Sequence, residues 1–145
     1  PMPATSDWGR MMDTPFAFAA VALAAVSWDG VLSAAGARSL RHALDYRQPF
    51  RGYDEARMVH LMDALLASLR SKGSQHLMVE AAAVLSPQQR ATAYAAATEI
   101  MRSDGPLQPD ECNILANLAE VLALEPGLTA DVGRVMDVLH ADLEI

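Results

Sequence analysis

The sequence predicts an all-α protein, folded as a compact bundle of about seven helices. Alanine and leucine are abundant, and no segment alternates between apolar and polar residues with the period of two that is typical of a strand. Residues that start and stop helices recur at short intervals along the chain. The chain has 145 residues, of which 52% are hydrophobic, so it can bury one core.

The first three helices are expected at residues 15–28, 34–47 and 54–71. The first starts at Thr14-Pro15, where a candidate N-cap precedes a proline in the first turn, and it stops before Gly30. Ser33 and Asp54 are the candidate N-caps of the next two, because their side-chain oxygens can accept a backbone N–H of the first turn. The third helix has an apolar face at helical spacing, made by Met58, Leu61, Met62, Leu65, Leu66 and Leu69.

The other four helices are expected at residues 75–85, 87–102, 109–124 and 129–142. Ser74 and Thr129 are candidate N-caps for the first and the last of these. The segment "SPQQ", residues 86–89, has the pattern of a capping box. In such a box the Ser86 side chain accepts the backbone N–H of Gln89, and the Gln89 side chain accepts the backbone N–H of Ser86. Further helix ends are marked by Gly73, Asp104-Gly105 and Pro126-Gly127.

Residues 13–145 are expected to form a single helical domain behind an N-terminal tail, residues 1–12. The apolar stretch "PFAFAAVALAAV" is too short to span a bilayer and is bounded by Asp13 and Asp29. We therefore expect a buried helix there and no direct insertion into a membrane. The single cysteine, Cys112, excludes an internal disulfide, which fits a cytoplasmic protein.

The charge of the chain argues against nucleic acid as a partner. The net charge is −7, with 18 acidic and 11 basic residues, whereas phosphate binding requires a basic face. The acidic residues gather toward the C-terminus, with ten acids and two bases from Glu99 onward. The segment from Arg38 to Lys72 has seven bases and four acids. The segment from Arg38 to Lys72 is therefore net basic, whereas the chain from Glu99 onward is net acidic.

The chain also contains a weak internal repeat. The segment "FAFAAVALAAVSWDGVLSAAGARSL" aligns without gaps with "ATAYAAATEIMRSDGPLQPDECNIL" at an offset of 75 residues. Asp29-Gly30 then coincides with Asp104-Gly105, and Leu32 with Leu107. Both copies have an apolar helix, Asp-Gly, one residue, Leu and a second helix. The repeat predicts two related helix–loop–helix units that pack together with approximate symmetry.

A repeated Asp-Gly-x-Leu-x-x-x-Glu between helices, in an all-helical domain of this length, resembles the TerB-like tellurite-resistance family. The segments "SWDGVLSAAG" and "RSDGPLQPDE" carry the resemblance, which covers roughly residues 13–142. The second copy fits the pattern fully, whereas Gly36 stands in the first copy where the glutamate belongs. The resemblance implies a non-enzymatic stress or tellurite-resistance module of the cytoplasm. Such a module would bind a divalent cation through its acidic loops and associate with protein partners, including at a membrane; a homo-oligomer is left open.

The residue types of the second loop suit a hard cation. Calcium and magnesium prefer oxygen ligands, which Asp104, Asp110, Glu111 and the loop carbonyls can supply. The loop matches the trailing half of an EF-hand, but Ile100 and Arg102 stand where the leading ligands belong. The candidate metal ligands are therefore Asp104 and Glu111, with Asp110 and Asp29 as lesser candidates, and weak binding is expected.

The same loop has a purely structural interpretation. Asp104 can form an Asx turn, Gly105 can supply a positive φ at the helix end, and Gln108 can be the N-cap of the next helix. Glu111 then reaches back as the third residue of a capping box. Because Asp104 stands at a helix C-terminus, its negative charge is unfavourable there by about 0.3–1 kcal/mol.

Two further functions remain open. A metal-free helical adaptor would dock partners through the basic stretch that contains Arg38, Arg41, Arg47, Arg51 and Arg57. An enzyme would need a site assembled from scattered residues, and no nucleophile–base pair, phosphate-binding loop or dinucleotide fingerprint is visible in the sequence. We therefore expect no enzymatic activity.

Overall fold

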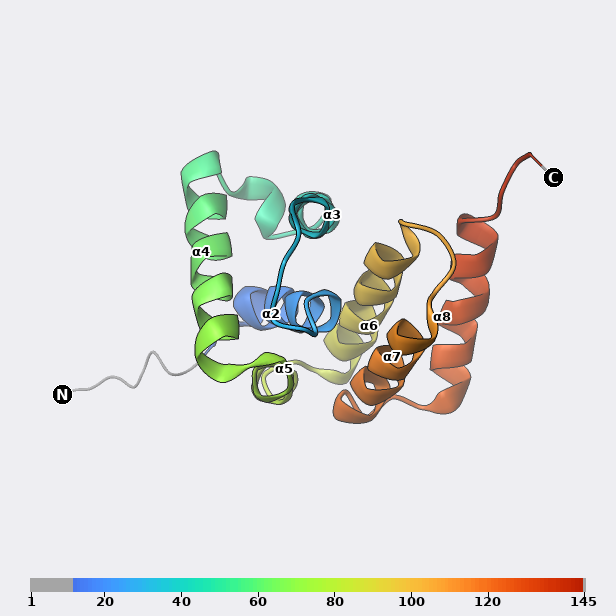
Figure 1. The fold of residues 1–145 in the computed structure, drawn as a ribbon. Coiled ribbons are helices and arrows are strands. Elements are labelled where there is room, and N and C mark those ends of the chain that lie inside the picture. Colours follow the sequence, from blue (N-terminus) through green and yellow to red (C-terminus); the bar gives the residue numbers. More distant parts are fainter. Residues whose placement is uncertain (1–11, 145) are drawn as a thin grey trace.

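The computed structural model describes residues 12–144 and contains seven α-helices and one 3-10 turn in that range (Figure 1). In chain order these are α2 (Thr14–Val26), α3 (Ala34–Asp45), the 3-10 turn η1 (Phe50–Gly52), α4 (Glu55–Lys72), α5 (Ser74–Ala82), α6 (Pro87–Arg102), α7 (Pro109–Val121) and α8 (Pro126–Leu139). The described residues form no strand, so the predicted all-α bundle of about seven helices is confirmed. The predicted tail lies outside the described residues, except for Met12, which packs against the core.

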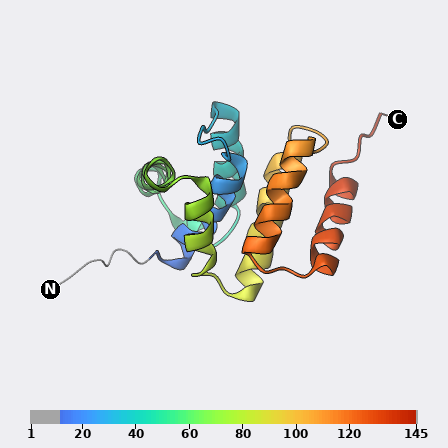
Figure 2. The same ribbon diagram turned by 60° about the horizontal axis from the view of Figure 1, so that its bottom comes forward.

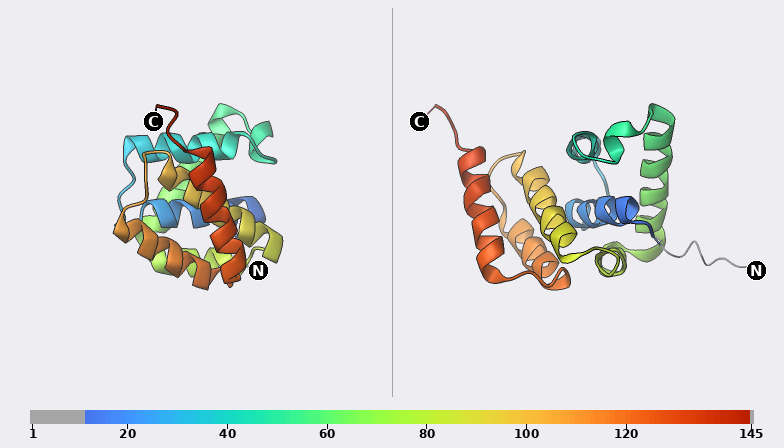
Figure 3. Two further views of the ribbon diagram at one scale, coloured as in Figure 1. Left: turned by 90° about the vertical axis from the view of Figure 1, so that its right-hand side faces the viewer. Right: turned by 180° about the vertical axis from the view of Figure 1, so that it is seen from behind.

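The other helices are arranged around α2. Every residue from Ala17 to Ala25 is buried, so this helix has no polar face. A helix that is apolar on all sides has to be covered on all sides. Accordingly α3, α4, α5, α6 and α7 all contact it, and α5 and α6 do so most extensively (Figures 1 and 3). Its many alanines leave room for the backbones of these neighbours to approach closely.

The outer helices are amphipathic. Met58, Leu61, Leu65 and Leu69 of α4 are buried, and Met62 and Leu66 pack partly against the core, which confirms the predicted apolar face. α4 and α8 lie at opposite ends of the molecule (Figures 1 and 3). α8 packs on α6 and contributes no fully buried residue (Figure 2).

The local capping predictions are confirmed at four helices. Ser33 accepts the Gly36 N–H at 2.9 Å, and Asp54 accepts the Arg57 N–H at 2.8 Å. Ser86 and Gln89 form the reciprocal capping box of α6. At α7, Gln108 is the N-cap, and Glu111 reaches back to it. Each of these caps is decided by residues within one helical turn, which is why the sequence reveals them.

Three other helix starts differ from the prediction. Asp13 rather than Thr14 caps α2, accepting the Phe16 N–H at 2.9 Å. Gly73, at φ +82°, precedes α5, and Ser74 is already helical. α8 starts at Pro126 rather than after Thr129, because proline suits the first helical position. The Thr129 hydroxyl therefore lies inside the helix and donates to the Pro126 carbonyl at 3.0 Å.

Within the described residues, no helix is both long enough and apolar enough to cross a membrane. α2 has only 13 residues, and its apolar surface is covered by the rest of the protein.

Replacing Leu23 by Ala tests the dependence of the fold on α2. Leu23 is fully buried, so we expect a loss of about 2–5 kcal/mol in the free energy of unfolding, because the change removes buried methyl groups and leaves a cavity. Denaturant unfolding followed by circular dichroism measures the loss. Val59→Ala is the control, because Val59 is 47% exposed on α4 and should change stability by less than about 0.5 kcal/mol. Equal losses in the two variants would contradict the central role of α2.

Candidate functional site

The two Asp-Gly loops have the same local structure at the predicted offset of 75 residues. α3 begins at Ala34 and α7 begins at Pro109, which are equivalent positions. The Gly30 N–H donates to the Ser27 carbonyl at 2.8 Å, and the equivalent Gly105 N–H donates to the Arg102 carbonyl at 3.0 Å. Both glycines have positive φ, +84° and +125°, which a side chain would oppose. The predicted helix–loop–helix repeat is therefore present in the secondary structure.

The two units also make reciprocal contacts with each other. The unit α2–α3 and the unit α6–α7 each have contacts within themselves. In addition, α3 contacts α6 and α7 contacts α2, so the second helix of each unit packs on the first helix of the other. Such reciprocal contacts are those of two like units related by an approximate two-fold axis.

An open pocket of about 280 Å³ lies where the two units meet. Its lining includes five pairs of residues that are equivalent under the 75-residue offset: Ala25 and Ile100, Val26 and Met101, Asp29 and Asp104, Gly36 and Glu111, Ser39 and Ile114. Trp28, Ser33 and Asp110 complete the lining. The pocket thus brings together all four predicted ligand residues, although Asp29 is distant in sequence from the other three.

Local hydrogen bonds orient three of the four carboxylates. Asp29 Oδ1 accepts the Val31 N–H at 3.1 Å, which is an Asx turn. Asp110 Oδ1 accepts the Glu111 N–H at 3.1 Å, and Glu111 Oε1 accepts the Gln108 N–H at 2.8 Å. An ionised carboxylate has about four acceptor positions, so each retains capacity for a ligand. Asp104 is exposed at the end of α6.

The carboxylates surround the pocket without forming a closed ligand cage. Among residues 12–144, no group of three or more His, Cys, Asp or Glu side chains is close enough together to hold a metal ion. The pocket has room for several water molecules, and magnesium usually keeps several waters of its own. A cation in this pocket would therefore have to be held through its water shell.

The missing glutamate of the first unit has a local explanation. Gly36 occupies the third position of α3, where Ser33 Oγ already accepts its N–H. A Cβ at this position would lie 3.2 Å from both Leu32 Cδ1 and Ser33 Oγ. The serine cap satisfies this helix end without the capping-box carboxylate that α7 obtains from Glu111. At these two equivalent positions of the lining, the second unit therefore has the Glu111 carboxylate, and the first unit has Gly36, which has no side chain.

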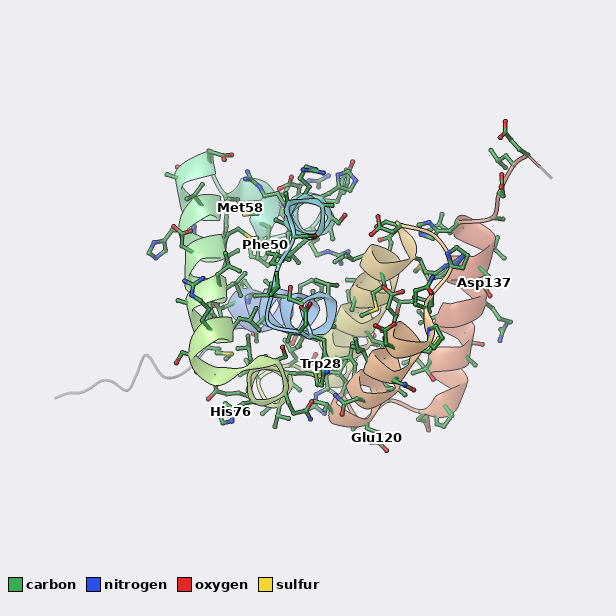
Figure 4. The ribbon with its side chains drawn as sticks, viewed as in Figure 1. Trp28, Phe50, Met58, His76, Glu120 and Asp137 are labelled. Atoms are coloured by element: carbon green, nitrogen blue, oxygen red, sulfur yellow. The ribbon has the colours of Figure 1, made fainter. Side chains whose placement is uncertain are left out.

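A contact that the sequence did not reveal holds the first loop in place. The buried hydroxyl of Ser74, at the start of α5, lies 3.1 Å from the Ser27 carbonyl and 3.0 Å from the Trp28 carbonyl and donates to them. Trp28, labelled in Figure 4, follows the end of α2 and is 38% exposed beside the pocket. No sequence signal connects Ser74 with this loop, because the contact spans 46 and 47 residues.

The basic stretch that the adaptor hypothesis uses is largely engaged within the molecule. Arg41 makes two hydrogen bonds to Glu55, at 2.6 and 3.2 Å, and these bonds lower the pKa of Glu55 below its ordinary value. The guanidinium of Arg47 lies 5.2 Å from the ring centre of Phe18, and that of Arg57 lies 4.0 Å from the ring centre of Tyr53. Arg41 is thus neutralised by Glu55, and Arg47 and Arg57 are held against aromatic rings of the same protein.

Cys112 is exposed near the start of α7, not packed in the core.

No family model, curated protein or solved structure matches the chain. The resemblance to the TerB-like family therefore stays a prediction that rests on the two Asp-Gly segments.

Replacing Gly105 by Ala tests the backbone of the second loop. At φ +125° an alanine is strained, so we expect a loss of about 1–3 kcal/mol in the free energy of unfolding. Gly127→Ala is the matched control, because Gly127 is helical, has open space around its Cβ position and should become more stable by about 0.4–1 kcal/mol. Thermal or denaturant unfolding measures both. A neutral Gly105 variant would show that the loop does not require glycine.

Proposed function

We propose that this protein is a non-enzymatic, TerB-like module of the stress or tellurite-resistance type in the cytoplasm. In this proposal it binds a divalent cation, calcium or magnesium, in the pocket between its two Asp-Gly loops and associates with protein partners, including partners held at a membrane. The observation that supports it most is the composition of the pocket: both loops contribute carboxylates to the lining, and no lysine or arginine of the described residues takes part in it.

The charge of the pocket favours a cation over other small ligands. Four carboxylates, those of Asp29, Asp104, Asp110 and Glu111, share one opening. The attraction between unit charges 4 Å apart is about 1 kcal/mol in bulk water and about 4 kcal/mol near a protein surface. Because the carboxylates also repel one another, a cation relieves part of that repulsion when it binds. Asp104, which stands at the unfavourable C-terminal end of α6, gains most from such a ligand.

Two polar groups of the lining also hold the starts of α3 and α7. The Ser33 hydroxyl accepts the Gly36 N–H and so serves as a helix cap, and the Glu111 carboxylate serves the start of α7. A cation held between the carboxylates of both loops would bridge the two units of the repeat. We therefore expect the ion to stabilise the packing of the units and not to take part in a reaction.

Calorimetric titration with calcium and with magnesium tests the cation site. We expect saturable binding with a dissociation constant on the order of 0.1–1 mM, the weak range of calcium sites. The double change Asp104→Asn with Glu111→Gln should abolish it, because two of the four carboxylate charges are lost. Both replacements keep hydrogen-bonding capacity, and Gln can still form the capping box.

The control for this titration carries the same charge change outside the pocket, Asp63→Asn with Glu120→Gln, two exposed positions on α4 and α7 (Figure 4 labels Glu120). It should bind the ion as the unchanged protein does. Equal weakening in both double variants would mean that only the net charge matters. No heat and no rise in melting temperature with millimolar ion would contradict the site.

The surface of α8 supports the association with a protein partner. Leu128, Val135 and Leu139 follow one another at intervals of seven and four, which places them on one face, and Val135 is 58% exposed. The adjacent Val138 is 78% exposed. Asp131 lies beside this face, whereas Asp137 lies on the opposite side of α8, where it pairs with Arg102 of α6 at 3.6 Å. Asp142 lies beyond the end of the helix. Arg134, which pairs with Asp131 at 2.7 Å, is the one basic residue of the helix.

An exposed apolar helix face can dock an amphipathic helix of another protein, and the net charge of −7 favours a helix that carries lysine or arginine beside its apolar residues. A second copy of this chain would also carry a charge of −7, so like charges would oppose its approach. The proposed partner segment is therefore a basic amphipathic helix of another protein.

A photo-crosslinking residue placed at Val135 tests this surface in cells. We expect cross-linked products whose linked peptide, identified by mass spectrometry, is apolar and basic. The same residue at Val59 of α4, 47% exposed, is the control and should not give these products. Peptides from this chain itself, acidic peptides, or the same products from both positions would contradict the proposal.

A further inference from the structure

A second open cavity, of about 640 Å³, lies on the other side of Ser39 and Ile100, which line both cavities. It is bounded by α3 and by the C-terminal ends of α6 and α8. Its lining consists of Arg38, Ser39, His42, Ala43, Tyr46, Arg47, Glu99, Ile100, Ser103 and His140. Four of these side chains are basic or can become so, and Glu99 is the one carboxylate. The character of this cavity is therefore opposite to that of the acidic pocket.

Some of these polar groups serve the ends of the helices. Tyr46, Ser103 and His140 are the C-caps of α3, α6 and α8, whose last carbonyls carry partial negative charge. Arg47 Nε donates to the Ala43 carbonyl at 3.1 Å, and Ser103 Oγ donates to the Ile100 carbonyl at 2.6 Å. These bonds offset the partial charges of two of the three helix ends. The bond to Ala43 also orients Arg47, whose guanidinium lies over the ring of Phe18.

Three side chains of the lining make no such hydrogen bond within the described residues, namely those of Arg38, His42 and His140. Arg38 lies on the exposed side of α3, more than one turn before its end, and brings a full positive charge to the cavity. His42 stacks edge-on against Tyr46, with ring centres 4.8 Å apart. The Nε2 atom of His140 is inaccessible to solvent and makes no hydrogen bond within the described part of the chain. A buried nitrogen of this kind is costly unless a ligand atom satisfies it.

We propose that this cavity binds a small soluble molecule that carries a phosphate group. The guanidinium of Arg38 has the fork geometry that phosphate oxygens accept, and Arg47 is a second arginine of the same lining. Ser39, Ser103 and His140 belong to the same lining, and hydroxyl and imidazole groups are of the kind that bind the remaining phosphate oxygens. The exposed ring of Tyr46 offers an apolar surface to the organic part, and the volume is that of an ordinary small-molecule site.

Titration with inorganic pyrophosphate and with adenosine monophosphate, followed by calorimetry or by NMR of the labelled protein, tests the proposal. We expect saturable binding of at least one of these probes at fixed ionic strength. Arg38→Ala should weaken it at least tenfold. His140→Gln should weaken it less, because the amide retains a donor. Both residues lie at the edge of the fold, and circular dichroism checks that the variants are folded.

Arg70→Ala is the matched control, since Arg70 is an exposed residue of α4 that does not line the cavity. It removes the same charge and should leave the affinity unchanged. Equal weakening by Arg38→Ala and Arg70→Ala would overturn the proposal, because binding would then reflect net charge alone. So would the absence of saturable binding at millimolar probe. Binding to phosphatidylglycerol vesicles that depends on Arg38, without binding of the soluble probes, would overturn it in favour of a lipid headgroup.

Discussion

The burial of α2 is the constraint on which the rest of the structure depends. A helix of 13 residues whose middle nine are all buried cannot exist at a protein surface, so five other helices have to surround it. Alanine dominates this segment, and its small side chain sets short distances between helix axes, which larger residues would not permit. The neighbouring helices cover α2 up to its ends, and the first Asp-Gly loop follows its C-terminal end. The position of the acidic pocket thus follows from the need to bury the helix before it.

The internal repeat determines which residues meet. Two like units that exchange contacts between their helices bring equivalent loops together, so Asp29 and Asp104 share a pocket although 75 residues separate them. The basic cavity lies next to it, and Ser39 and Ile100 form a common wall. Helix ends supply most of the lining of both cavities. The starts of α3 and α7 line the first cavity, and the C-caps of α3, α6 and α8 line the second.

The sequence predicted those features that depend on neighbouring residues or on the repeat. The helix order, the caps at Ser33 and Ser86 and the candidate ligands of the acidic pocket belong to this class. It did not predict the role of Ser74, because a hydroxyl that bonds to carbonyls 46 and 47 residues earlier leaves no local pattern. It misplaced the start of α8, because Pro126 can end one helix or begin the next, and here it takes the first helical position. The pairing of Arg41 with Glu55 was likewise hidden, since it joins two helices across the turn at η1.

The substitution of Gly36 for the expected glutamate has a consequence for how a guest is oriented. Two identical units would present a guest with two equivalent poses, related by half a turn, and the guest would occupy both. Here Glu111 faces a position without a side chain, so the two poses differ in energy. A pseudo-symmetric framework has in this way acquired a polar axis. A ligand that is not itself symmetric would therefore bind in one orientation, with one end toward α7 and the other toward α3.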